Sequence, residues 1–427
     1  MSYTFREIKQ CRICSSHEFE VVLNLDDQYI ASAFVGEAVS ADLSNKYPLE
    51  LVRCSSNKGC GLVQLKHSVN PDLMYADGYG YRSEINESMR DNLKSIVNQT
   101  VSIVELQDGD TVIDIGCNDG TLLNFYQDKN IDKVGFDLVL KIIESAREKG
   151  IDGINEPFSA ESFLRNRPGI KAKIITSIAM FYDLEDPSKF VQDVSSVLHD
   201  EGVWVIELSY LPTMLDMNSF DTICHEHLEY YSLRQIEWMA SRNGLQVTNV
   251  EFNDINGGSF RVFLQKEFIK VSSSAIEKIE AIREREQDLC LNTDKPYNKF
   301  RKEIEKFKES VTSLLFKLKS EGKMVYAYGA STKGNVLLQY AGITPELVQK
   351  AAERNQEKWG LYTLGTNIPI ISEAEARRDM PDYFFVLPWH FFSGFVKRER
   401  EFLERGGKFI LPLPEVKIVG KDDFMNG

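Results

Sequence analysis

The chain has 427 residues, 43% hydrophobic and 27% charged, which excludes wholesale disorder and suits two or three globular domains. Its 50 Lys and Arg against 64 Asp and Glu give a net charge of −14, which disfavours general binding of nucleic acid or anionic membrane. The first ten residues have no apolar core, and no run approaches the roughly 18 apolar residues of a membrane span. We therefore expect a cytoplasmic protein.

Four of the seven cysteines lie within the first 60 residues, as a C-x2-C pair followed by a C-x5-C pair. An odd cysteine count in a chain of this length argues against a disulfide scaffold. Two pairs of thiolates are the donor set of a closed, structural Zn²⁺ site, and the alternative is four buried cysteines without a metal. We predict a zinc-binding module over residues 1–70, with the ligands Cys11, Cys14, Cys54 and Cys60.

From residue 110 the pattern alternates between strands and helices. The predicted strands cover residues 111–116, 133–136, 174–180 and 203–208, and a closing β pair covers residues 245–252 and 259–266. Such alternation predicts an α/β fold with a doubly wound, mostly parallel sheet that binds its ligands at the carboxyl ends of the strands.

The first of these strands runs into VIDIGCNDG, which lacks the G-x-G-x-x-G fingerprint of dinucleotide-binding domains. Glycines in this loop would let the backbone approach a cofactor, and an acid at the end of the second strand would accept hydrogen bonds from both ribose hydroxyls. The pattern looks like a class I (Rossmann-like) S-adenosylmethionine (SAM) methyltransferase. We predict such a domain over residues 71–270, with SAM at Asp114, Gly116, Asn118, Gly120 and Asp137.

About 22 residues separate the strand at 203–208 from the helix that begins near Ser232. An insertion at this place lies over the rim of the active site. It contains His225, Glu226 and His227, and an extended conformation would point both histidines to one face. Histidine is the natural general base near neutral pH, and a carboxylate can fix its tautomer. A two-histidine metal site and a purely structural loop are the alternatives.

Five segments together resemble the nucleotide-sugar C-methyltransferases over essentially the whole chain. They are FDTICHEHLEYYSL, the two cysteine pairs, VIDIGCNDG, NGGSFRV and GASTKGNVLL. The resemblance implies the family's domain order: a zinc module, a SAM domain and a C-terminal α/β domain. It also implies methylation of a carbon, C3, beside the C4 ketone of a nucleotide-linked deoxysugar, through an enolate, to give a branched-chain sugar.

By this resemblance, His227 is the base, with Glu226 and His225 nearby. The enolate oxygen needs preorganised donors, which Tyr81, Tyr230 or His225 could supply. Tyr79 and Tyr81 match the tyrosine-rich stretch that precedes the SAM domain in the family. The chain differs from the family at Cys224, where tyrosine is common, and in AMFYD at residues 179–183, where a histidine often follows the fourth strand.

The charged residues 271–322 have apolar positions at helical spacing and predict connecting helices. A strand at 323–328, the loop GASTKG and a helix follow, an arrangement that presents backbone N–H groups and a lysine to an anion. The alternative is a loop that only turns the chain. A strand at 383–387 ends at Pro388-Trp389-His390, and a strand at 408–413 closes the sheet.

We therefore predict a second Rossmann-like α/β domain over residues 271–427, and the resemblance assigns the nucleotide-sugar substrate to it. The implied substrate-binding residues are Tyr79, Tyr230, Gly329, Ala330, Lys333, Gly334, Trp389 and His390. An O- or N-methyltransferase acting on a nucleotide sugar is the alternative enzyme. An NAD-type oxidoreductase lacks its fingerprint, and a non-catalytic zinc scaffold would not bind SAM.

Overall fold

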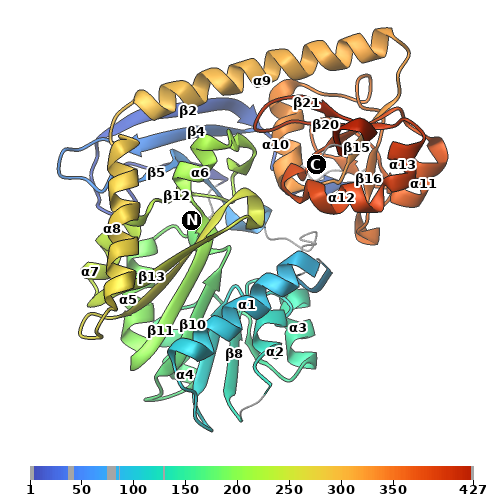
Figure 1. The fold of residues 1–427 in the computed structure, drawn as a ribbon. Helices are drawn as coiled ribbons and strands as arrows, with labels where there is room; N and C mark the ends of the chain where they lie inside the picture. Colours follow the sequence, from blue (N-terminus) through green and yellow to red (C-terminus); the bar gives the residue numbers. More distant parts are fainter. Residues whose placement is uncertain (1–3, 37–42, 75–82, 86, 128–129, 425–427) are drawn as a thin grey trace.

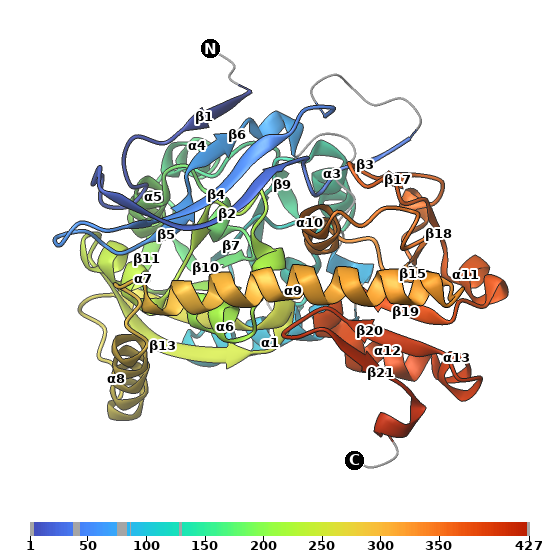
Figure 2. The same cartoon turned by 90° about the horizontal axis from the view of Figure 1, so that it is seen from above.

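The computed structural model describes residues 4–36, 43–74, 83–85, 87–127 and 130–424. Figure 1 shows an N-terminal module, a central α/β domain and a C-terminal α/β domain, bridged by the long helix α9 (Lys295–Ser320). In the view from above, α9 crosses the molecule toward the C-terminal domain (Figure 2). Within the described residues, no helix combines the length and the apolar character needed to span a membrane.

The central domain is built on a seven-stranded sheet with the order β13-β14-β11-β10-β7-β8-β9. Its strands are β7 (Thr111–Ile115), β8 (Asp132–Phe136), β9 (Asp152–Ile154), β10 (Ala172–Ile178), β11 (Leu198–Ser209), β13 (Leu245–Asn253) and β14 (Ser259–Lys266). Neighbours from β9 to β11 are parallel, whereas β14 is antiparallel to both β11 and β13. The doubly wound, mostly parallel sheet and its closing pair are thus confirmed.

Helices flank this sheet because each has one apolar face. They are α1 (Glu87–Ile103), α2 (Thr121–Asn124), α3 (Leu140–Glu148), α4 (Ala160–Asn166), α5 (Pro187–Val197), α6 (Leu211–Asp216) and α7 (Leu233–Ser241). In α1, Met89, Leu93 and Ile96 form one buried stripe at helical spacing. The helices α1, α4 and α6 were not predicted from the sequence.

The N-terminal module contains a four-stranded sheet with the order β12-β5-β4-β2. Its strands are β2 (Phe19–Gln28), β4 (Tyr47–Cys54), β5 (Val63–Leu65) and β12 (Glu229–Tyr230). Two small pairs join β1 (Phe5–Glu7) to β6 (His67–Val69) and β3 (Phe34–Val35) to β17 (Tyr362–Thr363). Since β12 comes from the insertion after β11, a segment of the central domain completes the N-terminal sheet.

The C-terminal domain has a six-stranded sheet with the order β18-β16-β15-β19-β20-β21. The strands are β15 (Val325–Tyr328), β16 (Ala351–Glu353), β18 (Ile370–Ser372), β19 (Tyr383–Val386), β20 (Lys408–Leu411) and β21 (Lys417–Val419). Besides α9, its helical part comprises α8 (Ser273–Asp288), α10 (Thr332–Ala341), α11 (Glu373–Asp379), α12 (Phe392–Arg398) and α13 (Arg400–Glu404). The expectation that residues 408–413 close the sheet is wrong, because β21 pairs with β20 and forms the edge.

One hydrophobic core joins the N-terminal module to the C-terminal domain. Leu49 and Leu51 of β4 belong to the same buried cluster as Phe300 and Ile304 of α9. The short N-terminal module therefore does not rely on a core of its own. Its sheet is stabilised by α9, which passes over β2 and β4 in Figure 1.

Candidate active site and metal centre

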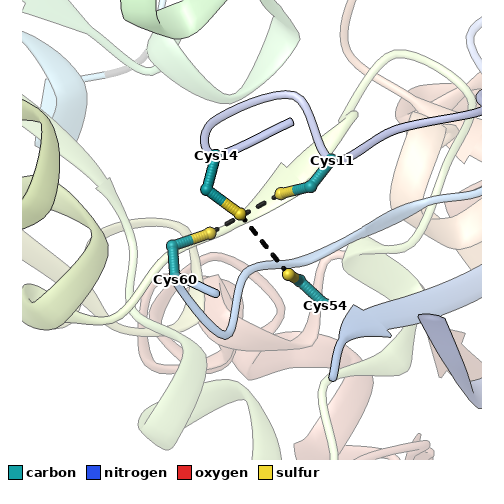
Figure 3. A group of neighbouring side chains, drawn as sticks. All are labelled: Cys11, Cys14, Cys54 and Cys60. Atoms are coloured by element: carbon teal, nitrogen blue, oxygen red, sulfur yellow. Dashed lines mark hydrogen bonds between the residues drawn. The ribbon is translucent and has the colours of Figure 1, made fainter. Parts of the chain in front are cut away.

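The four cysteines predicted to bind zinc converge on one point from two distant segments (Figure 3). The Sγ atoms of Cys11 and Cys60 are 3.5 Å apart, those of Cys14 and Cys54 are 3.6 Å apart, and all four lie within 4.8 Å of one another. A tetrahedral ion with Zn–S bonds of about 2.3 Å separates its sulfur ligands by about 3.8 Å, so the cluster fits Zn²⁺. Four protein ligands leave no open position, which makes the site structural.

The second cysteine pair depends on a close backbone approach at Gly59. A Cβ atom at this position would lie 2.7 Å from the Sγ of Cys54, closer than atoms can approach. The backbone N–H of Cys54 donates to the carbonyl of Leu62 at 2.8 Å. The wide C-x5-C spacing therefore forms a compact knuckle.

The zinc knuckle lies against the insertion of the central domain. Arg12, between the first two ligands, donates to the carbonyl of Leu65 at 2.7 Å, and its Nε is 3.5 Å from Oε1 of Glu229. Leu65 in turn donates its N–H to the carbonyl of Leu228 at 2.8 Å, next to the β5–β12 pairing. Charge and strand pairing thus fix the chain just beyond the H-E-H segment.

A cavity of about 270 Å³ lies at the carboxyl ends of β7 and β8, where SAM was expected. Asp114, Gly116, Asn118 and Asp137 line it, together with residues that follow β10. Gly120 does not line it and instead packs tightly, since a Cβ there would be 2.3 Å from Cδ1 of Ile151.

Asp137 braces the loop that borders this cavity. Its Oδ2 accepts from the N–H of Asn118 at 3.0 Å and its Oδ1 accepts from the N–H of Val139 at 2.9 Å. Gly116, Asn118 and Gly120 have φ angles of 72°, 49° and 75°, so the loop enters the left-handed region three times, and glycine adopts it without strain at two of these positions. Burial raises the pKa of Asp137.

Asp114 is the buried acid at the floor of the cavity. Its Oδ1 accepts from the hydroxyl of Thr176 at 2.6 Å. Burial raises the pKa of Asp114 to about 7, and the Thr176 hydrogen bond opposes that rise. The ionisation of this carboxyl therefore lies near physiological pH and will respond to a cation in the cavity.

The H-E-H segment is a turn, so the expectation of an extended conformation is wrong. The N–H of His227 donates to the carbonyl of Cys224 at 3.1 Å and closes this turn. As a result the two histidines contact different neighbours. The buried His225 packs edge-on against Tyr47, with ring centroids 6.1 Å apart, and its Nε2 donates to the Tyr47 carbonyl at 3.2 Å.

His227 is held in one tautomer by the backbone. Its Nδ1 lies 2.8 Å from the carbonyl oxygen of Thr222, and because a carbonyl only accepts, Nδ1 carries the hydrogen. The lone pair of the neutral ring is therefore on Nε2. Burial, and secondly the charge of Lys333, lower the pKa of His227 to about 4, while Glu226 opposes this shift. His227 is thus neutral at pH 7.

The ring of His227 lies over Tyr182, with centroids 4.3 Å apart. Tyr182 belongs to the turn η3 (Phe181–Asp183), and its neighbours Met180, Asp183 and Leu184 line the cofactor cavity. The imidazole itself lines a separate small pocket with Tyr182 and Tyr230, and through Tyr182 it packs on the segment that borders the cofactor cavity.

Glu226 is buried, and among the described residues neither of its carboxylate oxygens has a hydrogen-bond partner. The interpretation that a carboxylate fixes the histidine tautomer is therefore wrong, since the Thr222 carbonyl does so. Glu226 acts on His227 through its charge instead, because it raises the pKa of that ring.

The glycine loop of the C-terminal domain is not an open anion cradle, contrary to expectation. The N–H of Gly329 donates to the Ala352 carbonyl at 2.8 Å, and the N–H of Ala330 donates to Oε2 of Glu353 at 2.8 Å. The N–H of Gly334 donates to Oγ of Ser331, which caps α10. These groups are satisfied within the domain. Gly334 is required for packing, since a Cβ would lie 2.6 Å from the Cβ of Leu387.

Lys333, by contrast, reaches the central domain. Its Nζ donates to the carbonyl of Asn256 at 2.7 Å. Its charge lowers the pKa values of His227 and His390, in each case after burial. The charge of Lys333 thus acts on His227 of the H-E-H turn and on His390 of its own domain.

The remaining predicted residues divide into two groups. Trp389 donates its indole N–H to Oδ2 of Asp221 at 2.9 Å, and the Tyr230 hydroxyl donates to the Thr222 carbonyl at 3.4 Å. Both side chains thus contact the turn that holds His227. Tyr79 and Tyr81 lie outside the described residues.

Sequence reasoning missed several residues that shape the site: Arg12, Tyr182, Asp221, Thr222 and Glu229. Two of them carried a usable signal. Glu229 is an acid in an otherwise apolar and aromatic stretch, and Arg12 is a charged residue inside a metal knuckle. Charges in such places usually need a buried partner.

Three family models match the chain in succession. They are described as "Putative zinc binding domain" over residues 11–75, "Methyltransferase domain" over residues 81–250 and "C-methyltransferase C-terminal domain" over residues 254–414. The C-methyltransferase NovU of Streptomyces niveus is 29% identical over 421 residues, which cover 98% of each chain.

Solved structures resemble part of the chain. A complex of the Trm112 methyltransferase activator with a methyltransferase of Haloferax volcanii has a TM-score of 0.36 at 16% identity, over 46% of this chain and 97% of that one. The magnesium protoporphyrin IX methyltransferase ChlM of Synechocystis PCC 6803 with bound SAH has a TM-score of 0.34 at 15% identity, over 44% and 90%.

The three family models account for nearly the whole length of the chain, in the order in which the structure arranges its parts. Zinc and SAM are its cofactors, held by the cysteine cluster and by the methyltransferase domain. The chain is a SAM-dependent methyltransferase, and over nearly its whole length it is similar to the zinc-binding, methyltransferase and C-terminal domains of C-methyltransferases.

Proposed function

We propose that this enzyme transfers the methyl group of SAM to a carbon, C3, of a nucleotide-linked 4-keto-deoxysugar, with His227 as the base. The observation that carries the proposal is the His227 ring, which lies over Tyr182, on the segment that borders the cofactor cavity, with its lone pair on Nε2. NovU, which is named a C-methyltransferase, supports carbon as the acceptor.

In this proposal Nε2 of His227 removes the proton from the carbon beside the ketone, and the electron pair of the broken C–H bond forms the enolate. SAM, when bound, would supply an electrophilic methyl group. The carbon would form its new bond to this methyl as the methyl–sulfur bond breaks, and that electron pair would stay on the sulfur of the departing S-adenosylhomocysteine. A ketone α-proton is a weak acid, so the negative charge that develops on the oxygen has to be stabilised in place. His227 is neutral at pH 7 and therefore ready to accept the proton.

We propose Lys333 as the charge that faces the enolate oxygen. Its ammonium is close enough to lower the pKa of His227, and it is fixed by the Asn256 carbonyl. Of the two tyrosines predicted for this role, Tyr230 donates instead to the Thr222 carbonyl, and Tyr81 lies outside the described residues. His225 is directed to Tyr47 in the N-terminal sheet, so we assign it to positioning and not to the substrate.

We propose that residues 1–70, 71–270 and 271–427 serve as the zinc, cofactor and substrate parts of the enzyme. The substrate's nucleotide would then lie on the C-terminal domain, whose Lys333 donates to the Asn256 carbonyl of the central domain. The sugar would lie between this domain and the cofactor cavity.

The substitution His227→Ala tests the assignment of the base. With a nucleotide 4-keto-deoxysugar that the native enzyme methylates, kcat should fall by about 10²–10⁴-fold, the usual contribution of a positioned general base. The SAM dissociation constant should stay within about twofold, since His227 does not line the cofactor cavity. His199→Ala, at a histidine on β11 remote from the turn, is the matched control. Full activity of His227→Ala would refute the assignment.

A further inference from the structure

One buried hydrogen bond connects the C-terminal domain to the turn that holds His227. Trp389, in η7 (Trp389–Phe391), donates from Nε1 to Oδ2 of Asp221 at 2.9 Å. Asp221 and Thr222 belong to the same short turn, η4 (Phe220–Thr222), and the Thr222 carbonyl accepts from Nδ1 of His227 at 2.8 Å. Two hydrogen bonds, joined by the peptide link between Asp221 and Thr222, therefore lead from an indole of the C-terminal domain to the imidazole.

The rest of η4 is also packed on the C-terminal part of the chain. The ring of Phe220 contacts Phe307 of α9 and Tyr340 of α10 edge-on, with centroid distances of 5.1 and 5.4 Å. The ring of His227, in contrast, rests on Tyr182 of the central domain. The Thr222 carbonyl, which orients the imidazole, thus lies in a turn that packs on the C-terminal part of the chain. The Tyr182 ring, which supports the imidazole, belongs to the central domain.

The hydrogen bond between Trp389 and Asp221 is buried on both sides, with exposed fractions of 8% and 1%. Losing the indole would remove the side-chain hydrogen-bond donor of the buried Asp221 carboxylate, which would keep only the charge of Lys333 and the backbone N–H groups of Asp221 and Thr222. Losing a hydrogen bond to a buried carboxylate is costly. A displacement of Trp389 would therefore cost free energy unless η4 moved with it, so the positions of Trp389 and η4 are coupled.

We propose that Asp221 and Trp389 are positioning residues for His227, and that they make the tautomer of this histidine depend on the docking of the C-terminal domain. The inference rests on the proposed role of His227 as the base. It deepens that role, because the domain that we propose binds the substrate also determines whether the lone pair is on Nε2. Neither residue touches the substrate in this account.

Nuclear magnetic resonance of the full-length, zinc-loaded protein labelled with ¹⁵N-histidine tests the inference without a substrate. The His227 signals are assigned by their loss in His227→Ala. In the native protein Nδ1 should be the protonated nitrogen. In Trp389→Phe, which keeps the aromatic volume but removes the donor, a population with protonated Nε2 should appear. With a substrate that the native enzyme methylates, kcat of Trp389→Phe should be lower by about tenfold or more, because a base in the wrong tautomer cannot accept the proton.

Trp359→Phe is the matched control. It also removes one indole hydrogen bond of the C-terminal domain, from Nε1 to the Glu353 carbonyl at 2.9 Å, at a half-exposed site away from His227. The histidine spectrum and kcat should stay as in the native protein, and SAM affinity should be unchanged within about twofold in both tryptophan variants.

Substitutions at Asp221 give an independent test if Trp389→Phe fails to fold. Asp221→Asn keeps an oxygen acceptor for the indole and should retain the native tautomer, whereas Asp221→Ala should reproduce the effect of losing the donor. Native His227 signals in both Trp389→Phe and Asp221→Ala would overturn the inference. If His227→Ala kept full activity, the proposed base would be wrong, yet the nitrogen spectra would still decide whether Asp221 and Trp389 position this ring.

Discussion

Arg12 in the zinc knuckle and Glu229 in the insertion after β11 face each other in the protein interior, with Nε 3.5 Å from Oε1. Their side chains are 2% and 0% exposed. The charge of Arg12 opposes the rise in the pKa of Glu229 that burial causes, and the same Nε lies 3.7 Å from Oε2 of Glu185. Because Glu229 follows the H-E-H turn by two residues, the zinc module and the proposed base share one structural unit.

Zinc removal should therefore reduce catalysis more than cofactor binding. The protein as purified should contain one zinc per chain, and chelation should lower kcat while the SAM dissociation constant changes little, because no residue of the knuckle lines the cofactor cavity. Elemental analysis, calorimetric SAM titration and turnover measure the three quantities. Cys60→Ser should lose the metal, whereas Cys290→Ser, at a cysteine outside the cluster, should retain it. Less than about half an equivalent of zinc would contradict the metal site.

Asp137→Ala should weaken SAM binding by about 1.5–3 kcal/mol, the range for a hydrogen bond to a charged group. The loss has two sources, since the carboxylate both faces the cavity and braces the N–H groups of Asn118 and Val139. Asp137→Asn keeps one oxygen acceptor and should lose less. A dissociation constant that is the same in Asp137→Ala and the native protein would exclude this placement of the cofactor.

SAM affinity should depend on pH through Asp114. The carboxyl is protonated below its pKa of about 7, and only the ionised form attracts the positively charged cofactor. The SAM dissociation constant should thus rise as pH falls from 8 to 6, and binding near pH 7 should release protons. Calorimetry in buffers of different ionisation enthalpy measures that release. Asp114→Asn should bind SAM with little pH dependence, and the same pH dependence in this variant would show that another group titrates.

At saturating SAM, the loss of activity toward acid pH should begin only at low pH. A histidine base fails when it is protonated, and since burial and Lys333 lower the pKa of His227 to about 4, kcat/KM for the sugar should stay nearly level from pH 7 to about 5. Lys333→Met removes the second of these causes and should move the acid limb to higher pH. Lys323→Met, which alters an exposed lysine paired with Asp382, should leave it in place. An acid limb near pH 6.5 in the native enzyme would mean that a solvated histidine, and not His227, is the base.

Much of the fold could be predicted because it is encoded in local pattern. The buried strands β7, β8, β10 and β11 are short apolar runs, and α9 has apolar residues at helical spacing over its whole length. The zinc ligands could be found for a similar reason, since the identity of a metal ligand limits what it can do. Four cysteines in two pairs have few other uses in a chain with no disulfide framework.

The parts that could not be predicted depend on contacts between distant segments. Nothing near residues 225–227 indicates that Tyr47, 178 residues earlier, accepts from His225 and so helps to form a turn. Likewise, the sequence of the glycine loop predicts an anion site. In the structure, Glu353 on the neighbouring strand β16 already accepts from the backbone N–H of Ala330. Backbone groups are satisfied by whichever partner the tertiary fold supplies, and a local motif does not specify that partner.

The most direct test of C-methylation with His227 as the base is the identity of the atom that receives the methyl group. The enzyme is incubated in D₂O with a nucleotide 4-keto-deoxysugar and SAM labelled with ¹³C in its methyl group, and the product is analysed by NMR. We expect the native enzyme to form a product whose ¹³C methyl is bonded to the sugar carbon beside the ketone. His227→Ala should form this product at a greatly reduced rate or not at all. A ¹³C methyl bonded to oxygen or nitrogen would contradict C-methylation.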